Sequence, residues 1–138
     1  MSHRRSRLRS RNRRRRGVAA AEFALCLPLL VILPLATIEA CSMIFLNHSL
    51  TIAGYEGVRV AINYDGTNAD TMDRCNEIIT ERKVNNSSVS LSVADVSLVP
   101  RGTPITITVT APCDANAIIP PWFFGGRSLT ATTTMVKE

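Results

Sequence analysis

Histidine and aromatic residues are scarce in this 138-residue chain. Only two histidines occur, His3 and His48, so a multi-histidine metal centre or a histidine-based catalytic triad has almost nothing to build with. The chain also lacks a recognisable nucleotide-binding loop and a pair of catalytic carboxylates, so we expect no enzyme activity, no metal and no cofactor. Aromatic residues make up 5% of the chain against 46% hydrophobic residues overall, which excludes a globally disordered protein.

Acidic residues are missing from the N-terminus. Residues 1–16 contain nine of the 16 basic residues and no acid, which leaves seven basic against eleven acidic residues in 17–138, a balance of −4. The overall charge of +5 therefore belongs to a basic leader on a mildly acidic body. It does not indicate a nucleic-acid-binding domain, and we expect no nucleic-acid partner. The leader cannot bury a core, and we expect it to be disordered by itself.

A long apolar segment follows the leader. Residues 18–46 contain two charges, Glu22 and Glu39, which flank an uncharged stretch over residues 23–38. As a helix, residues 18–46 would be roughly 43 Å long, more than the hydrocarbon core of a bilayer requires. Pro28 and Pro34 argue against a soluble amphipathic helix but are tolerated in a membrane span. The arginines before the segment predict a cytoplasmic N-terminus and an outer C-terminal body.

Three kinds of processing compete for this N-terminus. A secretory signal would be cleaved after the apolar region. A lipoprotein signal would be cut before Cys41, although Glu39 close to that cut is a poor match. The third alternative cuts between Gly17 and Val18 and leaves the apolar helix on the mature protein. An intramembrane carboxylate at Glu22 favours the third, because the freed Val18 amine, or that of a neighbouring copy, could pair with it and set helix register between subunits.

The stretch RRRRGVAAAEFALCLPLLVILPLATIEACSMIFLNHSLTIAGYEGVRVA resembles the N-terminal module of TadE-like pseudopilins of the tight-adherence (Tad/Flp) pilus system. The resemblance covers residues 13–62, under half of the chain. Cys26, Cys41 and the pure-arginine leader depart from the family pattern. The matching positions, in order, are Gly17, Glu22, Phe23, Ala24, Leu25, Pro28, Glu39 and the stretch 55–59.

This resemblance implies cleavage after Gly17 by a prepilin peptidase and a mature N-terminus at Val18. It implies a role in assembling an adhesive pilus rather than in forming its bulk. The implied partners are the membrane, the peptidase, other Tad pilins or pseudopilins and inner-membrane assembly components. The implied location is the bacterial inner membrane, as a single-pass protein, with incorporation into the pilus left open. Glu22, Phe23 and Glu39 would take part in helix register and assembly, although the outer interface would also solvate Glu39. The alternative is an uncleaved, membrane-anchored surface-binding module.

The remainder predicts a small α+β outer domain, pilin-like in outline. The helix continues into water over 47–62, a turn follows at 63–68, and a second helix covers about 69–84, capped by Thr67 or Asn68. Alternating patterns predict strands over 89–98, 104–111 and 128–136, with a bend near Asp95 and a hairpin turn at 101–102. The second helix should pack on this antiparallel sheet and leave a Ser/Thr-rich face exposed. The domains are therefore 1–17, 18–46 and 47–138.

Two further features concern the outer domain. Cys75 and Cys113 could form a disulfide in an oxidising compartment, worth about 3–4 kcal/mol, or could stay as buried thiols. The apolar stretch 118–126, which contains Trp122, Phe123 and Phe124, could be an exposed partner or membrane-interface patch. We expect it instead to fold back and cover the sheet.

Overall fold

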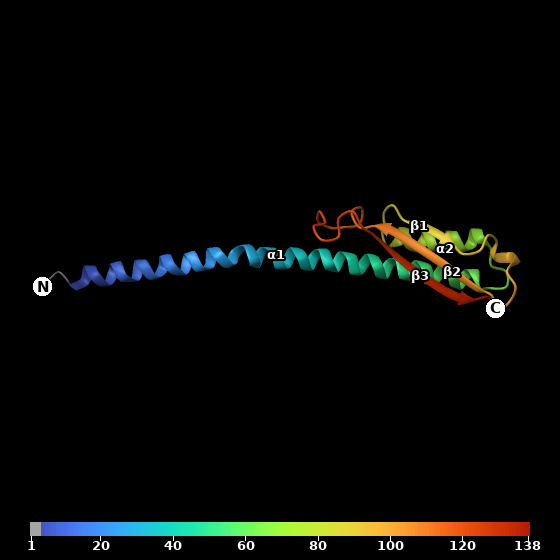
Figure 1. The fold of residues 1–138 in the computed structure, drawn as a ribbon, viewed down its shortest axis with the longest axis horizontal. Coiled ribbons are helices and arrows are strands. Elements are labelled where there is room, and N and C mark those ends of the chain that lie inside the picture. Colours follow the sequence, from blue (N-terminus) through green and yellow to red (C-terminus); the bar gives the residue numbers. More distant parts are fainter. Residues whose placement is uncertain (1–3) are drawn as a thin grey trace. The chain divides into compact units, whose positions relative to one another are not determined.

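The computed structural model describes the backbone of residues 4–138 and the side chains from residue 18 onward, so the side chains of the leader lie outside the described residues, and the surroundings of Gly17, the predicted cleavage position, are not described. The α+β class is confirmed, with a long N-terminal apolar helix, a second helix and a three-stranded antiparallel sheet (Figure 1). The elements in order are α1 (Arg4–Ala61), α2 (Asn68–Glu81), β1 (Ser88–Leu91), the 3-10 helix η1 (Val96–Leu98), β2 (Pro104–Pro112) and β3 (Ser128–Val136).

Helix α1 is 58 residues long and contains both Pro28 and Pro34. Its part Val18–Ala61 is long and apolar enough to cross a membrane, by length and composition. The helix extends back through the leader to Arg4, where the sequence analysis expected no ordered structure. Arginine has a high intrinsic helix propensity, so an existing apolar helix can propagate into an arginine run.

The chain divides into two compact units, Met1–Thr37 and Ile38–Glu138. The second unit starts earlier than residue 47, where the sequence places the start of the outer domain. The reason is that Glu39, Ser42, Met43 and Leu46 are all buried. The last turns of the predicted membrane segment are therefore covered by the folded unit itself.

A tight turn after α1 leads into α2. A Cβ atom at Gly66 would overlap the carbonyl oxygen of Val60, so this position requires glycine. Thr67 then caps α2, as the sequence predicts, and its hydroxyl accepts a hydrogen bond from the Asp70 amide at 3.2 Å. Cys75, Ile78 and Ile79 lie on the buried face of α2 as expected, and Thr71 joins them.

The sheet has the order β1-β2-β3, with both pairs antiparallel. Strands β2 and β3 agree with the predicted ranges to within a residue, whereas β1 ends at Leu91 instead of continuing to 98. Asp95 explains this difference, because its carboxylate accepts from the amide and the hydroxyl of Ser97 and starts the 3-10 helix η1. The connection from β1 to β2 is accordingly a long loop and not a tight hairpin.

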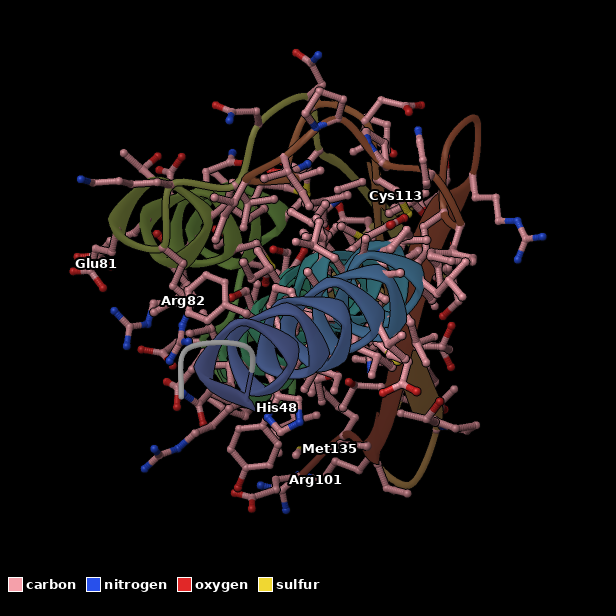
Figure 2. The ribbon with its side chains drawn as sticks, turned by 90° about the vertical axis from the view of Figure 1, so that its left-hand side faces the viewer. His48, Glu81, Arg82, Arg101, Cys113 and Met135 are labelled. Carbon is pink, nitrogen blue, oxygen red and sulfur yellow. The ribbon has the colours of Figure 1, made fainter. Side chains whose placement is uncertain are left out.

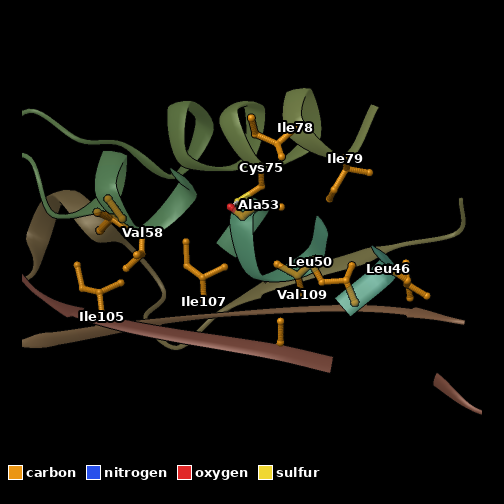
Figure 3. Close-up of a cluster of buried hydrophobic side chains, with 14 residues drawn as sticks. Leu46, Leu50, Ala53, Val58, Cys75, Ile78, Ile79, Ile105, Ile107 and Val109 are labelled. Atoms are coloured by element: carbon orange, nitrogen blue, oxygen red, sulfur yellow. Dashed lines mark hydrogen bonds between the residues drawn. The ribbon is translucent and has the colours of Figure 1, made fainter. Parts of the chain in front are cut away.

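The core of the folded unit lies where α1 contacts both α2 and the sheet (Figure 3). On β2 one face is apolar and fully buried, and the opposite face carries threonines, as predicted. In Figure 3 the C-terminal half of α1 lies between α2 and the strands, so α1 supplies the helix surface at the centre of the sheet. The largest members of the core are Leu46, Leu50 and Val58 of α1, Ile78 and Ile79 of α2, and Ile105, Ile107 and Val109 of β2.

Candidate functional site

The carboxylate of Glu39 makes the most distinctive polar contact in the folded unit. Its side chain is 2% exposed, and its Oε1 accepts the backbone N–H groups of Phe123 and Phe124, both at 2.8 Å. These are charge-assisted hydrogen bonds between residues more than 80 positions apart in the chain. The expectation that water at the outer interface solvates Glu39 is therefore wrong. Glu39 instead fixes the apolar loop 118–126, which precedes β3, to helix α1.

The base of this loop is closed by a second carboxylate. Asp114 accepts the Gly126 amide at 2.9 Å, and the Cys113 amide donates to the Arg127 carbonyl at 2.8 Å. Gly126 has a φ of 70°, a left-handed conformation that favours glycine. Hydrogen bonds thus hold the backbone of the loop at its base, through Asp114, and at its tip, through Glu39.

Three large apolar side chains of this loop are exposed. Trp122 is 80% exposed, Ile118 is 79% exposed and Phe123 is 56% exposed, while Phe124 is partly buried. The expectation that this stretch covers the sheet is therefore wrong for Ile118, Trp122 and Phe123, because the loop is attached to α1 through backbone amides. What the structure presents is an exposed apolar surface on a fixed loop.

The other sequence-predicted assembly residues lie on α1 in the first unit. Val18 and Phe23 are each 59% exposed, and Glu22 is also exposed. Glu22 and Glu39 belong to the same helix, yet only Glu39 is part of the folded unit. Glu22 and Glu39, which were expected to share a role in helix register and assembly, therefore differ in their surroundings: Glu22 is exposed and Glu39 is buried. Processing at Gly17 and the register role of Glu22 stay predictions.

The two cysteines of the folded unit are free thiols, and both are buried. Cys75 projects from α2 onto α1, where its thiol donates to the Ala53 carbonyl at 3.4 Å. Cys113 follows β2 and lies away from the C-terminal end of α2, where Glu81 and Arg82 project outward (Figure 2). Of the two alternatives that the sequence left open, the structure has the buried thiols. Burial raises the pKa of Cys75 to about 11.

Charged side chains join the end of the chain and α2 to α1. Arg74 of α2 forms ion pairs with Glu56 of α1 at 3.2 Å and with Glu77 at 2.7 Å. The buried Lys137 donates through Nζ to the carbonyl oxygens of Ala61 at 3.0 Å and Asn63 at 2.5 Å. A cation at this position also complements the negative end of the α1 dipole. The contacts of Lys137 are not predictable from the sequence, because no pattern in it marks a partner for this side chain.

The described side chains, from residue 18 onward, contain no group of three or more His, Cys, Asp or Glu residues that could hold a metal ion. The carboxylates of Glu39 and Asp114 and the ammonium of Lys137 bind backbone groups and hold the loop and the chain end in place. What the arrangement offers is an anchored helix and an exposed loop, both of which suit association with a membrane or with other subunits.

Comparison with known families gives one match. Residues 17–59 match the family described as TadE-like protein. This segment is TadE-like. No curated protein and no solved structure matches the chain. The TadE-like match starts at Gly17 and ends two residues before the end of α1, so it covers the apolar helix and excludes α2 and the sheet.

The TadE-like family is associated with the Tad pilus, and its members are membrane-associated pilus components that are not typically enzymes. The single apolar N-terminal helix of this chain fits a single-pass membrane anchor.

Proposed function

We propose that this chain is a non-enzymatic pseudopilin that takes part in assembly of a Tad/Flp-type adhesive pilus after a prepilin peptidase cleaves it between Gly17 and Val18. The TadE-like match over residues 17–59 carries this proposal, because its first residue is the proposed cleavage position and it follows the apolar helix to its end. The unbroken helix from the leader into a small α+β unit supports it.

The proposed mechanism is physical. Residues 18–38 make a helix of roughly 31 Å, close to the thickness of the bilayer core. Cleavage would place the Val18 amine one helical turn from Glu22, so the two charges can neutralise each other within one chain or between neighbouring chains. The small residues at 19–21 allow helices to approach closely beside this charge.

The arginines of the leader favour a cytoplasmic N-terminus, which places the unit Ile38–Glu138 outside the inner membrane. The partners in this arrangement are the peptidase, other Tad pilins or pseudopilins and the assembly components of the inner membrane. The folded unit would be presented to them at a height set by the membrane helix.

Cleavage is tested by N-terminal sequencing and intact mass of the full chain, co-expressed with a prepilin peptidase and extracted from membranes. We expect a mature protein that begins at Val18. Gly17→Leu should block processing, whereas Ala20→Leu, an equally bulky change beyond the cut, should leave processing intact. A wild-type protein that keeps the leader in the presence of active peptidase contradicts the proposal and favours the uncleaved surface-binding module.

Assembly is tested separately through Glu22. We expect Glu22→Ala to insert into the membrane normally but to lose co-purification with the pilus components, because the buried charge pair is gone. Glu22→Asp keeps the carboxylate and should retain part of the association. Equal co-purification of wild type and Glu22→Ala would remove the register mechanism.

A further inference from the structure

The loop 118–126 combines a fixed backbone with an exposed apolar surface. Residues 115–126 contain no Asp, Glu, Lys or Arg. Exposed large apolar side chains on a loop held by hydrogen bonds are costly in water, and such patches mark contact with a partner or a membrane. We define the loop surface by its three exposed apolar side chains, Ile118, Trp122 and Phe123.

The position of this surface follows from Glu39. The carboxylate binds the amides of Phe123 and Phe124, so the loop surface lies beside the part of α1 at which the folded unit begins. Figure 1 shows the loop at that end of the folded unit. In the sequence, Glu39 is the first charged residue after the uncharged stretch 23–38. If that stretch is in the bilayer core, Glu39 and the loop bound to it lie at headgroup level.

We propose that the loop surface is a membrane-interface foot that inserts Ile118, Trp122 and Phe123 into the headgroup region of the outer leaflet. The proposal rests on the membrane-spanning α1 of the proposed function. Tryptophan and phenylalanine suit this region, since their rings are apolar while the indole N–H stays hydrated. The absence of charge in the loop removes the cost of bringing acidic or basic groups to the lipid.

Exposed apolar residues of α1 lie at a similar height on the helix. Ile44 and Phe45, about one and a half helical turns after Glu39, are 59% and 56% exposed and lie on the side of the helix away from Glu39. Beyond them Leu46, Leu50 and Ala53 are buried in the core. A lipid surface at this height covers the helix and the loop together.

Glu39 is the positioning residue of the foot. Without its carboxylate, the amides of Phe123 and Phe124 lose their acceptor, and the tip of the loop is held only through its base at Asp114. With the carboxylate in place, the folded unit contacts the bilayer at two points, the helix and the foot. Two contacts restrict rotation and tilt of the unit about α1, so the Thr-rich face of the sheet has a defined orientation above the membrane.

The experiment uses Trp122, the only tryptophan of the chain. The full chain is reconstituted into phosphatidylcholine–phosphatidylglycerol vesicles that contain lipid brominated either near the headgroup or near the chain end. We expect headgroup-proximal bromine to reduce Trp122 emission by about twofold and terminal bromine to have little effect, because interfacial indoles stay at headgroup depth. Acrylamide should quench Trp122 less in vesicles than in denaturant.

The matched control is the double variant Trp122→Phe and Tyr64→Trp. Tyr64 is 84% exposed, about as much as Trp122, but follows the far end of α1, roughly 38 Å along the helix axis from Glu39. Its replacement tryptophan should be quenched by acrylamide and not by brominated lipid. In Glu39→Ala, which removes the acceptor, quenching of Trp122 by headgroup-proximal bromine should fall toward the control, while hydrogen exchange of the β2 amides stays unchanged. Glu39→Gln keeps a side-chain oxygen that can accept both amides and should retain most of the quenching.

The outcomes separate the two proposals. A chain that alkaline carbonate removes from the vesicles does not span the membrane, and the proposed function and the foot fail together. A chain that stays in the vesicles while acrylamide quenches Trp122 as freely as the control tryptophan leaves the span intact and overturns the foot. Protection from acrylamide without quenching by brominated lipid means that protein covers the loop, which also overturns the proposal.

Discussion

Gly57 of α1 offers a sharp test of the packing between the two helices and the sheet. A Cβ atom at this position would overlap the Sγ of Cys75 on α2 and would lie 3.2 Å from the Cδ1 of Ile107 on β2. The sequence suggested either a weakened helix or close packing here, and the structure shows close packing. We therefore expect Gly57→Ala to destabilise the folded unit although alanine is the better helix former.

The magnitude follows from two opposing contributions. Replacing glycine by alanine inside a helix gains about 1 kcal/mol of intrinsic propensity. Forcing a methyl group into a filled core costs about 1–3 kcal/mol, since Cys75 is fully buried and its thiol must leave the Ala53 carbonyl. The net loss should be up to about 2 kcal/mol, and each kcal/mol lowers Tm by roughly 4–8 °C for a unit of this size.

The cause of the loss can be isolated with Cys75→Ala, which removes the overlapping sulfur atom. In that background the remaining neighbours are the flexible end of Ile107 at 3.2 Å and the Thr71 carbonyl oxygen at 3.5 Å, an ordinary contact distance, so Gly57→Ala should be neutral or stabilising by up to about 1 kcal/mol. Gly54→Ala is the matched control on the same helix, because its Cβ would meet the Thr133 Oγ1 at 3.1 Å, a contact that a small shift of this side chain relieves.

The measurement is hydrogen exchange of the β2 amides in the full chain, purified in detergent, with thermal unfolding as a second readout. Exchange at β2 reports on the folded unit, whereas helix content would be dominated by α1. The reasoning is refuted if Gly57→Ala is as stable as Gly54→Ala. It is also refuted if Cys75→Ala does not relieve the effect of Gly57→Ala.

Two further predictions concern buried polar groups. Lys137→Met should destabilise the folded unit by about 1–3 kcal/mol in thermal unfolding, because the carbonyls of Ala61 and Asn63 lose their donor. Lys83→Met is an exposed control with the same loss of charge and should stay within about 0.5 kcal/mol of wild type. Equal stability of the two variants would show that the hydrogen bonds of Lys137 contribute nothing to stability. Burial raises the pKa of Cys75 to about 11, so little thiolate is present at neutral pH. Alkylation of Cys75 by iodoacetamide, measured by mass spectrometry, should therefore be slow at about pH 7, faster as the pH approaches about 11, and fast in denaturant. Fast alkylation of the folded chain at neutral pH would contradict this burial.

The elements of the fold follow from local patterns in the sequence. Alternation of apolar residues with threonines predicted β2 and β3, and helical spacing together with Thr67 predicted α2 and its start. These signals depend on neighbouring residues only, which is why they can be recognised in a single sequence. The first strand was predicted too long, because the alternation up to Leu98 looked continuous while the Asp95 side chain bound the nearby Ser97 amide and formed a 3-10 turn.

The contacts that organise the site are of another kind. Glu39 binds two amides from residues 123 and 124, and Lys137 binds two carbonyls from residues 61 and 63. Every one of these partners is a backbone group, and backbone groups are the same in all residues except proline. Sequence can therefore show that a charged side chain stands in an apolar region and needs a partner, but it has no pattern that names the partner.

Glu39 shows how this affects the interpretation of the whole chain. As a charge near the end of an apolar helix, it has the sequence signature of a solvated boundary residue, and the outer domain was accordingly expected to start later, at residue 47. Its burial places the start of the folded unit at Ile38, the last residue of the uncharged stretch 23–38. In the proposed arrangement about 20 residues, 18–37, are then left for the bilayer, the length that a single span needs. The two hydrogen bonds of Glu39 accordingly attach the apolar loop to the first residues of the folded unit, where the proposed span ends.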